Sequence, residues 1–203
     1  MENKIAAIIS KILHPLFIPT YLLLIFLNVD FSFSMMITLK GKFLMLALVF
    51  LTTAVIPAFL ILIYYRMGWV KSLYLEERKE RMLPLFTAGV MFLIAAIMLK
   101  NLQMTNPYFY LLLGAAVMTV VVMLITNFWK ISVHTTSMGG MLGASIALAI
   151  HFGIDIPLFI YVIAILSGIV GYARLKLKAH NESQVYGGYI AGFLSMFLLF
   201  SYF

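Results

Sequence analysis

Basic and imidazole side chains gather in three short polar segments of a chain that is otherwise mostly apolar. The segments cover residues 66–83, 131–137 and 173–183. Arginine presents a planar fork that matches phosphate oxygens, and lysine adds a compact positive charge. A neutral imidazole can attack phosphorus or shuttle a proton to a leaving oxygen. The residues that we single out for phosphate chemistry are Lys71, Arg78, Ser132, His134, Arg174 and His180.

The composition of the chain indicates that lipid surrounds most of it. Of its 203 residues, 64% are hydrophobic and only 10% are charged. Soluble domains are about 45–50% apolar and about 25% charged. The sequence therefore predicts an all-α fold, a polytopic transmembrane helix bundle, with residues 1–203 forming a single integral membrane domain.

Six apolar stretches predict transmembrane helices, for which about 17–25 residues are usual, and the second and fourth of them are slightly shorter than that. They cover about residues 43–65, 84–99, 108–128, 138–152, 156–172 and 184–203. Residues 1–28 are an uncertain first span. Residues 3–13 have the pattern of an amphipathic interfacial helix, and His14, Pro15 and Pro19 interrupt it before a short apolar run. We expect six spans, or seven if this first one crosses.

The three polar segments are separated from one another by two spans each, so they must face the same side of the membrane. If the first span also crosses, that side carries eleven of the 14 Lys and Arg residues, with Lys40, Lys42 and Lys100 opposite. The positive-inside rule then predicts that the segments face the cytoplasm. Removing Lys71, Arg78 and Arg174, the expected phosphate ligands, from the count weakens this bias but keeps its sign.

Several classes of function are disfavoured by composition. Without cysteine, the chain has no disulfides, thiolate metal sites or cysteine nucleophiles. The net charge of +7 is not arranged as a basic stripe with interleaved aromatic residues, so we expect no nucleic-acid partner. The histidines have no acidic neighbours at metal-ligand spacing, so we expect neither a metal nor another cofactor.

The order and spacing of these residues resemble the type 2 phosphatidic acid phosphatase family over about residues 66–192. The first family signature is Lys, six residues, Arg-Pro, and here Lys71 and Arg78 have that spacing, with Lys79 in place of Pro. The second is Pro-Ser-Gly-His, matched by Ser132 and His134. The third is Ser-Arg, five residues, His, three residues, Asp, matched by Arg174 and His180. Arg81 is a second candidate for the Arg of the first signature.

This resemblance implies a phosphohistidine mechanism. His180 is expected to attack phosphorus, and His134 to protonate the leaving oxygen and then activate water. Lys71, Arg78, Ser132 and Arg174 are expected to bind the phosphate oxygens. The substrate implied is a lipid phosphate, such as phosphatidate or an isoprenoid phosphate, in a bacterial plasma membrane. Many bacterial relatives of this family work on the outer face, whereas the charge count here favours the inner one.

Two substitutions at the expected catalytic centre keep a second interpretation open. Gln184 stands where the family has Asp, and its amide oxygen can orient the imidazole of His180 but supplies no negative charge. Val133 replaces Gly where a backbone N–H approaches the phosphate. The alternative is a weak or inactive relative that binds or transports lipid phosphates. A third interpretation is a structural membrane protein whose basic loops only set its orientation.

Overall fold

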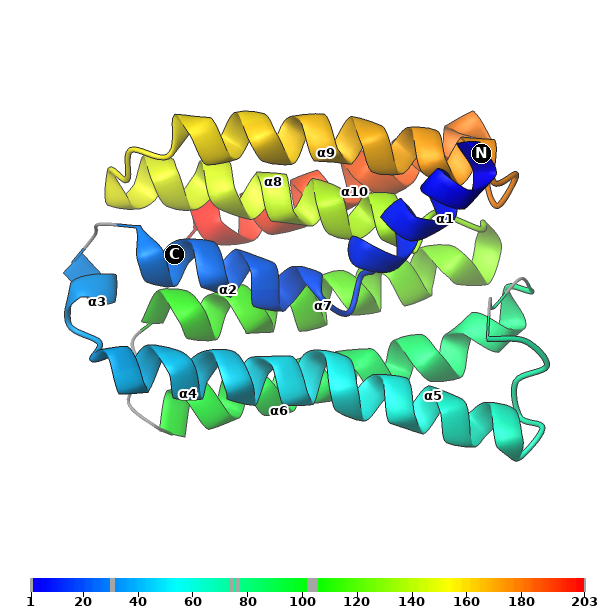
Figure 1. Cartoon of the computed structure of the whole chain (residues 1–203), viewed down its shortest axis with the longest axis horizontal. Helices are drawn as coiled ribbons and strands as arrows, with labels where there is room; N and C mark the ends of the chain where they lie inside the picture. The colour runs from blue at the N-terminus through cyan, green and yellow to red at the C-terminus, as the bar shows by residue number, and fades with distance from the viewer. Residues whose placement is uncertain (1, 30–31, 74, 76, 102–105, 203) are drawn as a thin grey trace.

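The computed structural model describes residues 2–29, 32–73, 75, 77–101 and 106–202, and the regular elements in these ranges are helices (Figure 1). Within these described ranges, six helical stretches are long and apolar enough to cross a membrane. The expected all-α fold is confirmed. The elements of these stretches are α4 (Leu39–Phe50), η1 (Leu51–Val55), α5 (Ile56–Arg66), η2 (Lys79–Arg81), α6 (Met82–Asn101), α7 (Asn106–Phe128), α8 (Val133–Phe152), α9 (Pro157–Lys176) and α10 (Glu182–Ser201).

The N-terminal part of the chain forms two short helices, α1 (Glu2–Ile12) and α2 (Ile18–Asn28), of 11 residues each. Each is about 16 Å long, half the roughly 30 Å of a bilayer core. Figure 1 shows α2 lying among the long helices, with α1 continuing from the break to the end of the bundle that carries the N-terminus. The break falls at Pro15, which lacks a backbone N–H, and α2 then begins with Pro19 in its first turn.

Pro57, near the start of α5, is preceded by a π-helical turn. Residues Leu51–Val55 form this wide turn, η1, directly before α5. A proline cannot donate to the carbonyl four residues earlier, and its ring collides with that carbonyl in a regular helix. The hydroxyl of Thr52 donates to the carbonyl oxygen of Leu48 at 2.8 Å, which adds a side-chain bond to the distorted ladder.

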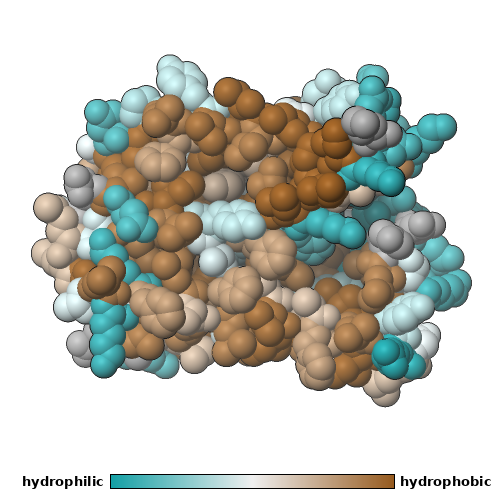
Figure 2. Space-filling model, in the orientation of Figure 1, coloured by the Kyte–Doolittle hydropathy of each residue, from teal (hydrophilic) through white to brown (hydrophobic). Residues whose placement is uncertain are grey.

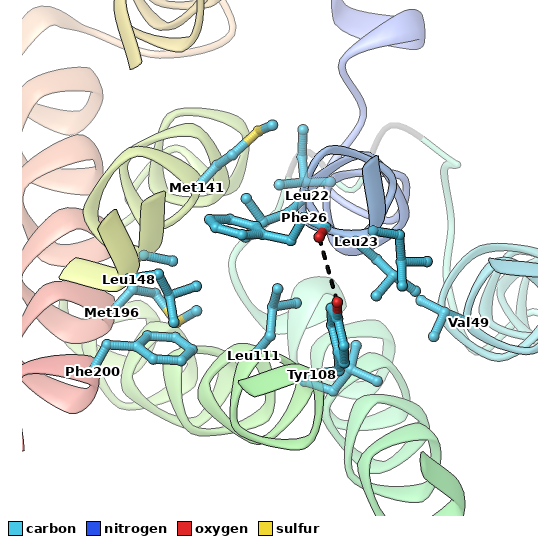
Figure 3. Close-up of a cluster of buried hydrophobic side chains, with 14 of the residues drawn as sticks. Leu22, Leu23, Phe26, Val49, Tyr108, Leu111, Met141, Leu148, Met196 and Phe200 are labelled. Atoms are coloured by element: carbon cyan, nitrogen blue, oxygen red, sulfur yellow. Dashed lines mark hydrogen bonds between the residues drawn. The ribbon is translucent and has the colours of Figure 1, made fainter. Parts of the chain in front are cut away.

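The helices α8 and α10 pack backbone against backbone near the centre of the bundle. A Cβ atom on Gly192 would collide with the carbonyl oxygen of Thr136, and one on Gly139 with that of Tyr189. Glycine is therefore required for this close approach. Around the pair lies the main apolar core, to which α2 and α7 also contribute; Figure 3 shows Phe26 and Tyr108 within it, joined by a hydrogen bond of 3.4 Å. A short helix, α3 (Ser32–Met35), connects α2 to α4.

The helices nearest the polar segments are longer than the hydropathy pattern predicts. The start of α8 is Val133, five residues before the expected span, because Ser132 caps it by accepting from the backbone N–H of Thr135. The end of α9 is Lys176, four residues beyond the expected span. His134 and Arg174 therefore lie on helices and not in loops. All three polar segments lie at the end of the bundle that carries the N-terminus (Figure 1).

Candidate active site

The loop from α9 to α10 positions His180 through a helix cap. Asn181 accepts from the backbone N–H of Gln184 at 3.0 Å, and Gln184 reaches back to the backbone N–H of Asn181, which together form a capping box. Lys178, with φ of 53°, turns the chain sharply before this cap. His180 itself is 8% exposed. The capping box directly after His180 thus fixes the position of its imidazole.

The side-chain oxygen of Gln184 also fixes the tautomer of His180. This Oε1 atom accepts from the backbone N–H of Asn181 at 3.4 Å, and it lies 3.0 Å from Nδ1 of His180. Because a backbone N–H can only donate, the amide atom it meets is the oxygen, and Nδ1 must donate to it. The proton of a neutral His180 then sits on Nδ1, which leaves the lone pair of Nε2 for nucleophilic attack.

His134 lies in the first turn of α8 and faces the N-terminal part of the chain. Its Nε2 atom donates to the carbonyl oxygen of Ser10 at 3.1 Å, and its ring meets that of His14 edge-on, with 5.2 Å between the centroids. Ser132 lies two residues earlier, fully buried, and its N–H donates to the carbonyl oxygen of Gln184 at 3.1 Å. Ser132 thus caps α8 and also bonds it to the first turn of α10.

Two arginines enter the same region without an acidic partner among the described residues. Arg81 is 7% exposed and donates to the carbonyl oxygens of Leu75 at 2.8 Å and Ile131 at 3.1 Å. Arg174 donates to the hydroxyl of Ser10 at 3.4 Å, while its Nε–H is buried and has no hydrogen-bond partner in the described structure. A buried guanidinium is costly unless an anion compensates its charge, so this region is suited to an anionic ligand.

These groups line one cavity of about 780 Å³. The cavity is bounded by residues of α1, α2, α5, α6, α7, α8, α9 and α10 and of the loop between α9 and α10. Among the described residues that line it, none is acidic. Figure 2 shows hydrophilic side chains in a hollow of the surface toward the same end of the molecule. The cationic and imidazole side chains of the lining are Lys11, His14, Arg81, Lys130, His134, Arg174, Lys178 and His180.

The charges of this cavity keep His180 neutral. Burial and the nearby positive charges of Arg81, Arg174 and Lys130 together lower the pKa of His180 to about 3, against the opposing effect of the hydrogen bond to Gln184. A neutral imidazole is the form that attacks an electrophile. Across the physiological pH range, His180 therefore carries no charge before a ligand binds.

Lys71 and Arg78 lie outside the cavity. Lys71 is exposed and pairs with Glu77 at 3.2 Å, and its N–H donates to Glu80. Arg78 is also exposed and donates to the carbonyl oxygen of Phe128 at 2.7 Å, beside the start of the second polar segment. Of the two arginines proposed for the first signature, Arg81 is the one that reaches the cavity.

The sequence patterns do not reveal the part that Ser10 takes. Its carbonyl meets His134 and its hydroxyl meets Arg174, so one turn of α1 contacts two of the predicted site residues. Ser10 belongs to no motif, and a contact of its backbone carbonyl cannot be predicted from the type of its side chain. His14, between α1 and α2, also lines the cavity and contacts His134.

A scan against protein-family models found no match, and searches of the curated proteins and of the solved structures found none either. The fold and its six long apolar helices define an integral membrane protein. The function is therefore inferred from the cavity and its residues alone.

Proposed function

We propose that this protein is a membrane lipid-phosphate phosphatase or phosphotransferase that works through a phosphohistidine on His180. The observation that carries the proposal is the orientation of His180 toward an anion site: Gln184 holds Nδ1, and Arg81 and Arg174 line the same cavity without an acidic partner among the described residues. A buried cationic cavity next to a neutral imidazole suits a phosphomonoester better than it suits a purely structural role.

The proposed reaction has two steps. Nε2 of His180 attacks phosphorus, and the bond from phosphorus to the lipid oxygen breaks. His134, which takes up a proton when the anionic phosphate binds beside it, gives that oxygen its proton. His134 then takes a proton from water as the water oxygen attacks phosphorus, which breaks the P–N bond and releases phosphate. Replacing water by an alcohol gives phosphotransfer.

The residues around the phosphate have separate parts in this mechanism. Arg81 and Arg174 stabilise the negative charge on the phosphate oxygens in both steps. The hydrogen bond from Nε2 of His134 to the carbonyl oxygen of Ser10 leaves Nδ1 as the nitrogen that exchanges the proton.

The proposed location is a bacterial plasma membrane, with the cavity opening toward the cytoplasm. The excess of Lys and Arg at this end of the bundle supports this orientation. The proposed partners are the lipid phosphate, of the phosphatidate or isoprenoid type, and the surrounding membrane lipids.

The test is phosphate release by the purified protein in lipid nanodiscs, measured on a panel of single-chain and two-chain lipid phosphates. We expect turnover in the wild type and a loss of at least about a hundredfold in His180→Asn. His151→Asn is the matched control, because His151 is an exposed histidine at the far end of α8. Equal rates in wild type and His180→Asn contradict the proposed mechanism.

One observation favours the second candidate, a binding protein that does not turn its ligand over. Gln184 is uncharged, so it stabilises the imidazolium-like nitrogen that forms as His180 attacks less than a carboxylate would. Saturable binding of a lipid phosphate without phosphate release, unchanged in Gln184→Asp, supports this candidate. A large gain in rate in Gln184→Asp contradicts it.

A further inference from the structure

The cavity continues from its charged end into the apolar interior of the bundle. Along α7 its lining extends from Val122 to Leu111, a distance of about 16 Å at the helical rise of about 1.5 Å per residue. The inner residues come from four helices, and Figure 3 shows Leu22 of α2, Leu111 of α7, Met141 of α8 and Met196 of α10 there. One end of the cavity is thus cationic and the other is apolar.

We expect a cavity with a large apolar end to bind a ligand. Protein interiors are packed to crystal-like density, and voids larger than one water molecule are few. An apolar chamber gives water too few hydrogen-bond partners to hold it. Its depth of about 16 Å matches one leaflet of a bilayer, whose whole hydrocarbon core is about 30 Å thick. Methionines on three helices, Met118, Met141 and Met196, give the wall an adaptable surface.

We infer that the chamber binds the hydrocarbon chain of a single-chain lipid phosphate, whose phosphate lies among Arg81, Arg174 and His180. This inference rests on the proposed function for the position of the phosphate, and it adds where the chain lies and how many chains fit. At about 30 Å³ for each water-sized group, 780 Å³ holds roughly 26 such groups. A phosphate with one chain of about 16 carbons fits that space, whereas a two-chain lipid of the same chain length needs roughly twice as much.

Two alanines set the width of the chamber. Ala88 of α6 and Ala115 of α7 line it and are 7% and 5% exposed. A phenylalanine at either position fills space that the chain requires. Val117, two residues after Ala115, is 42% exposed and does not line the cavity, so Val117→Phe is the matched control for added bulk on the same helix.

The experiment uses a 16-carbon alkyl phosphonate with a diazirine near the end of its chain, added to the protein in nanodiscs of zwitterionic lipid. The phosphonate cannot be hydrolysed, so labelling does not depend on turnover. After illumination, we expect mass spectrometry to find the label on interior residues such as Phe92, Leu111 and Met196. Labelling only on outward residues such as Leu93, Val120 and Leu198, which are 42–53% exposed, overturns the inference.

The variants test the same chamber independently. We expect Ala115→Phe and Ala88→Phe each to reduce interior labelling by about tenfold, because excluding about two methylenes has that effect on binding, while Val117→Phe leaves it unchanged. Thermal unfolding checks that each variant is folded. Equal labelling in all three variants overturns the inference.

Competition tests the charged end and separates the two proposals. An excess of unlabelled dodecyl phosphonate should prevent interior labelling, and dodecyl trimethylammonium should not. Interior labelling without phosphate release from any single-chain lipid phosphate leaves the chamber standing and removes the proposed function. Phosphate release with labelling confined to the outer face overturns the inference about the chamber and leaves the proposed function in place.

Discussion

Gln184 Oε1 lies 3.0 Å from Nδ1 of His180, and the same oxygen accepts the backbone N–H of the residue between them. A single amide thus closes a helix cap and orients a buried imidazole. An aspartate in its place would add a negative charge, so the difference between the two lies in the charge of the site more than in its geometry.

The first prediction is that Gln184→Asp raises the pKa of His180. Burial and the neighbouring cations hold this pKa at about 3 in the wild type, and a carboxylate beside Nδ1 stabilises the protonated ring. NMR titration of ¹⁵N-labelled histidine measures the shift, with His151→Asn used to assign the exposed histidine. A pKa that stays at its wild-type value in Gln184→Asp is inconsistent with the contact.

The second prediction concerns stability against pH. The unfolded chain protonates His180 near pH 6.5, but the folded protein does not until about pH 3, so the unfolded state binds more protons between these values. The contribution of His180 to stability is therefore present above about pH 6.5 and is lost as the pH falls toward 3. Unfolding in detergent at several pH values should show a shallower decline in His180→Gln than in the wild type. Parallel curves of stability against pH for the two proteins would show that His180 does not cause the decline.

The third prediction separates the cations that line the cavity from those outside it. Arg81→Lys and Arg174→Lys lose the planar fork inside the cavity, and we expect phosphonate binding to weaken by about tenfold or more, since hydrogen bonds to charged groups contribute about 1.5–3 kcal/mol. Lys71→Ala removes only an exposed ion pair, worth about 0–1 kcal/mol. Calorimetry in nanodiscs compares them. A larger loss of phosphonate binding in Lys71→Ala than in Arg81→Lys would indicate that the phosphate binds at the residues of the first signature.

The fourth prediction tests the contact between α8 and α10. A Cβ on Gly192 meets the carbonyl oxygen of Thr136, so Gly192→Ala forces the helices apart at a cost of about 1–3 kcal/mol or more. Gly168 of α9 has open space at its Cβ position, and Gly168→Ala is the control, expected to be neutral or slightly stabilising. Thermal unfolding of the purified variants measures both. Similar midpoints in the two variants would rule out the tight contact.

The fifth prediction concerns the side of the membrane. Because the chain has no cysteine, single cysteines can be introduced on a clean background. Leu73→Cys lies near the cavity end and Asp155→Cys in the loop at the opposite end, and both positions are exposed. The charge bias predicts that an impermeant maleimide labels Asp155→Cys in intact cells and Leu73→Cys only after lysis. The opposite pattern would place the cavity outside.

The helix bundle was predictable because apolar runs of about 20 residues have few other folds available to them. The convergence of Arg174, His180 and His134 was also predictable, since counting crossings places their segments on one side. The choice between Arg78 and Arg81 was not, because both lie in one charged stretch and their separation depends on the short turn η2 that carries Arg81 inward. The contacts of Ser10 depend on how α1 packs against α9, which no local pattern encodes.

The central claim is that His180 is the nucleophile. It is tested most directly by rapid acid-free quenching of the protein with a ³²P-labelled single-chain lipid phosphate, followed by mapping of the labelled peptide. The mechanism predicts an acid-labile, base-stable phosphohistidine at residue 180 in the wild type and none in His180→Asn. Turnover with no phosphohistidine, or a label that persists in His180→Asn, would contradict it.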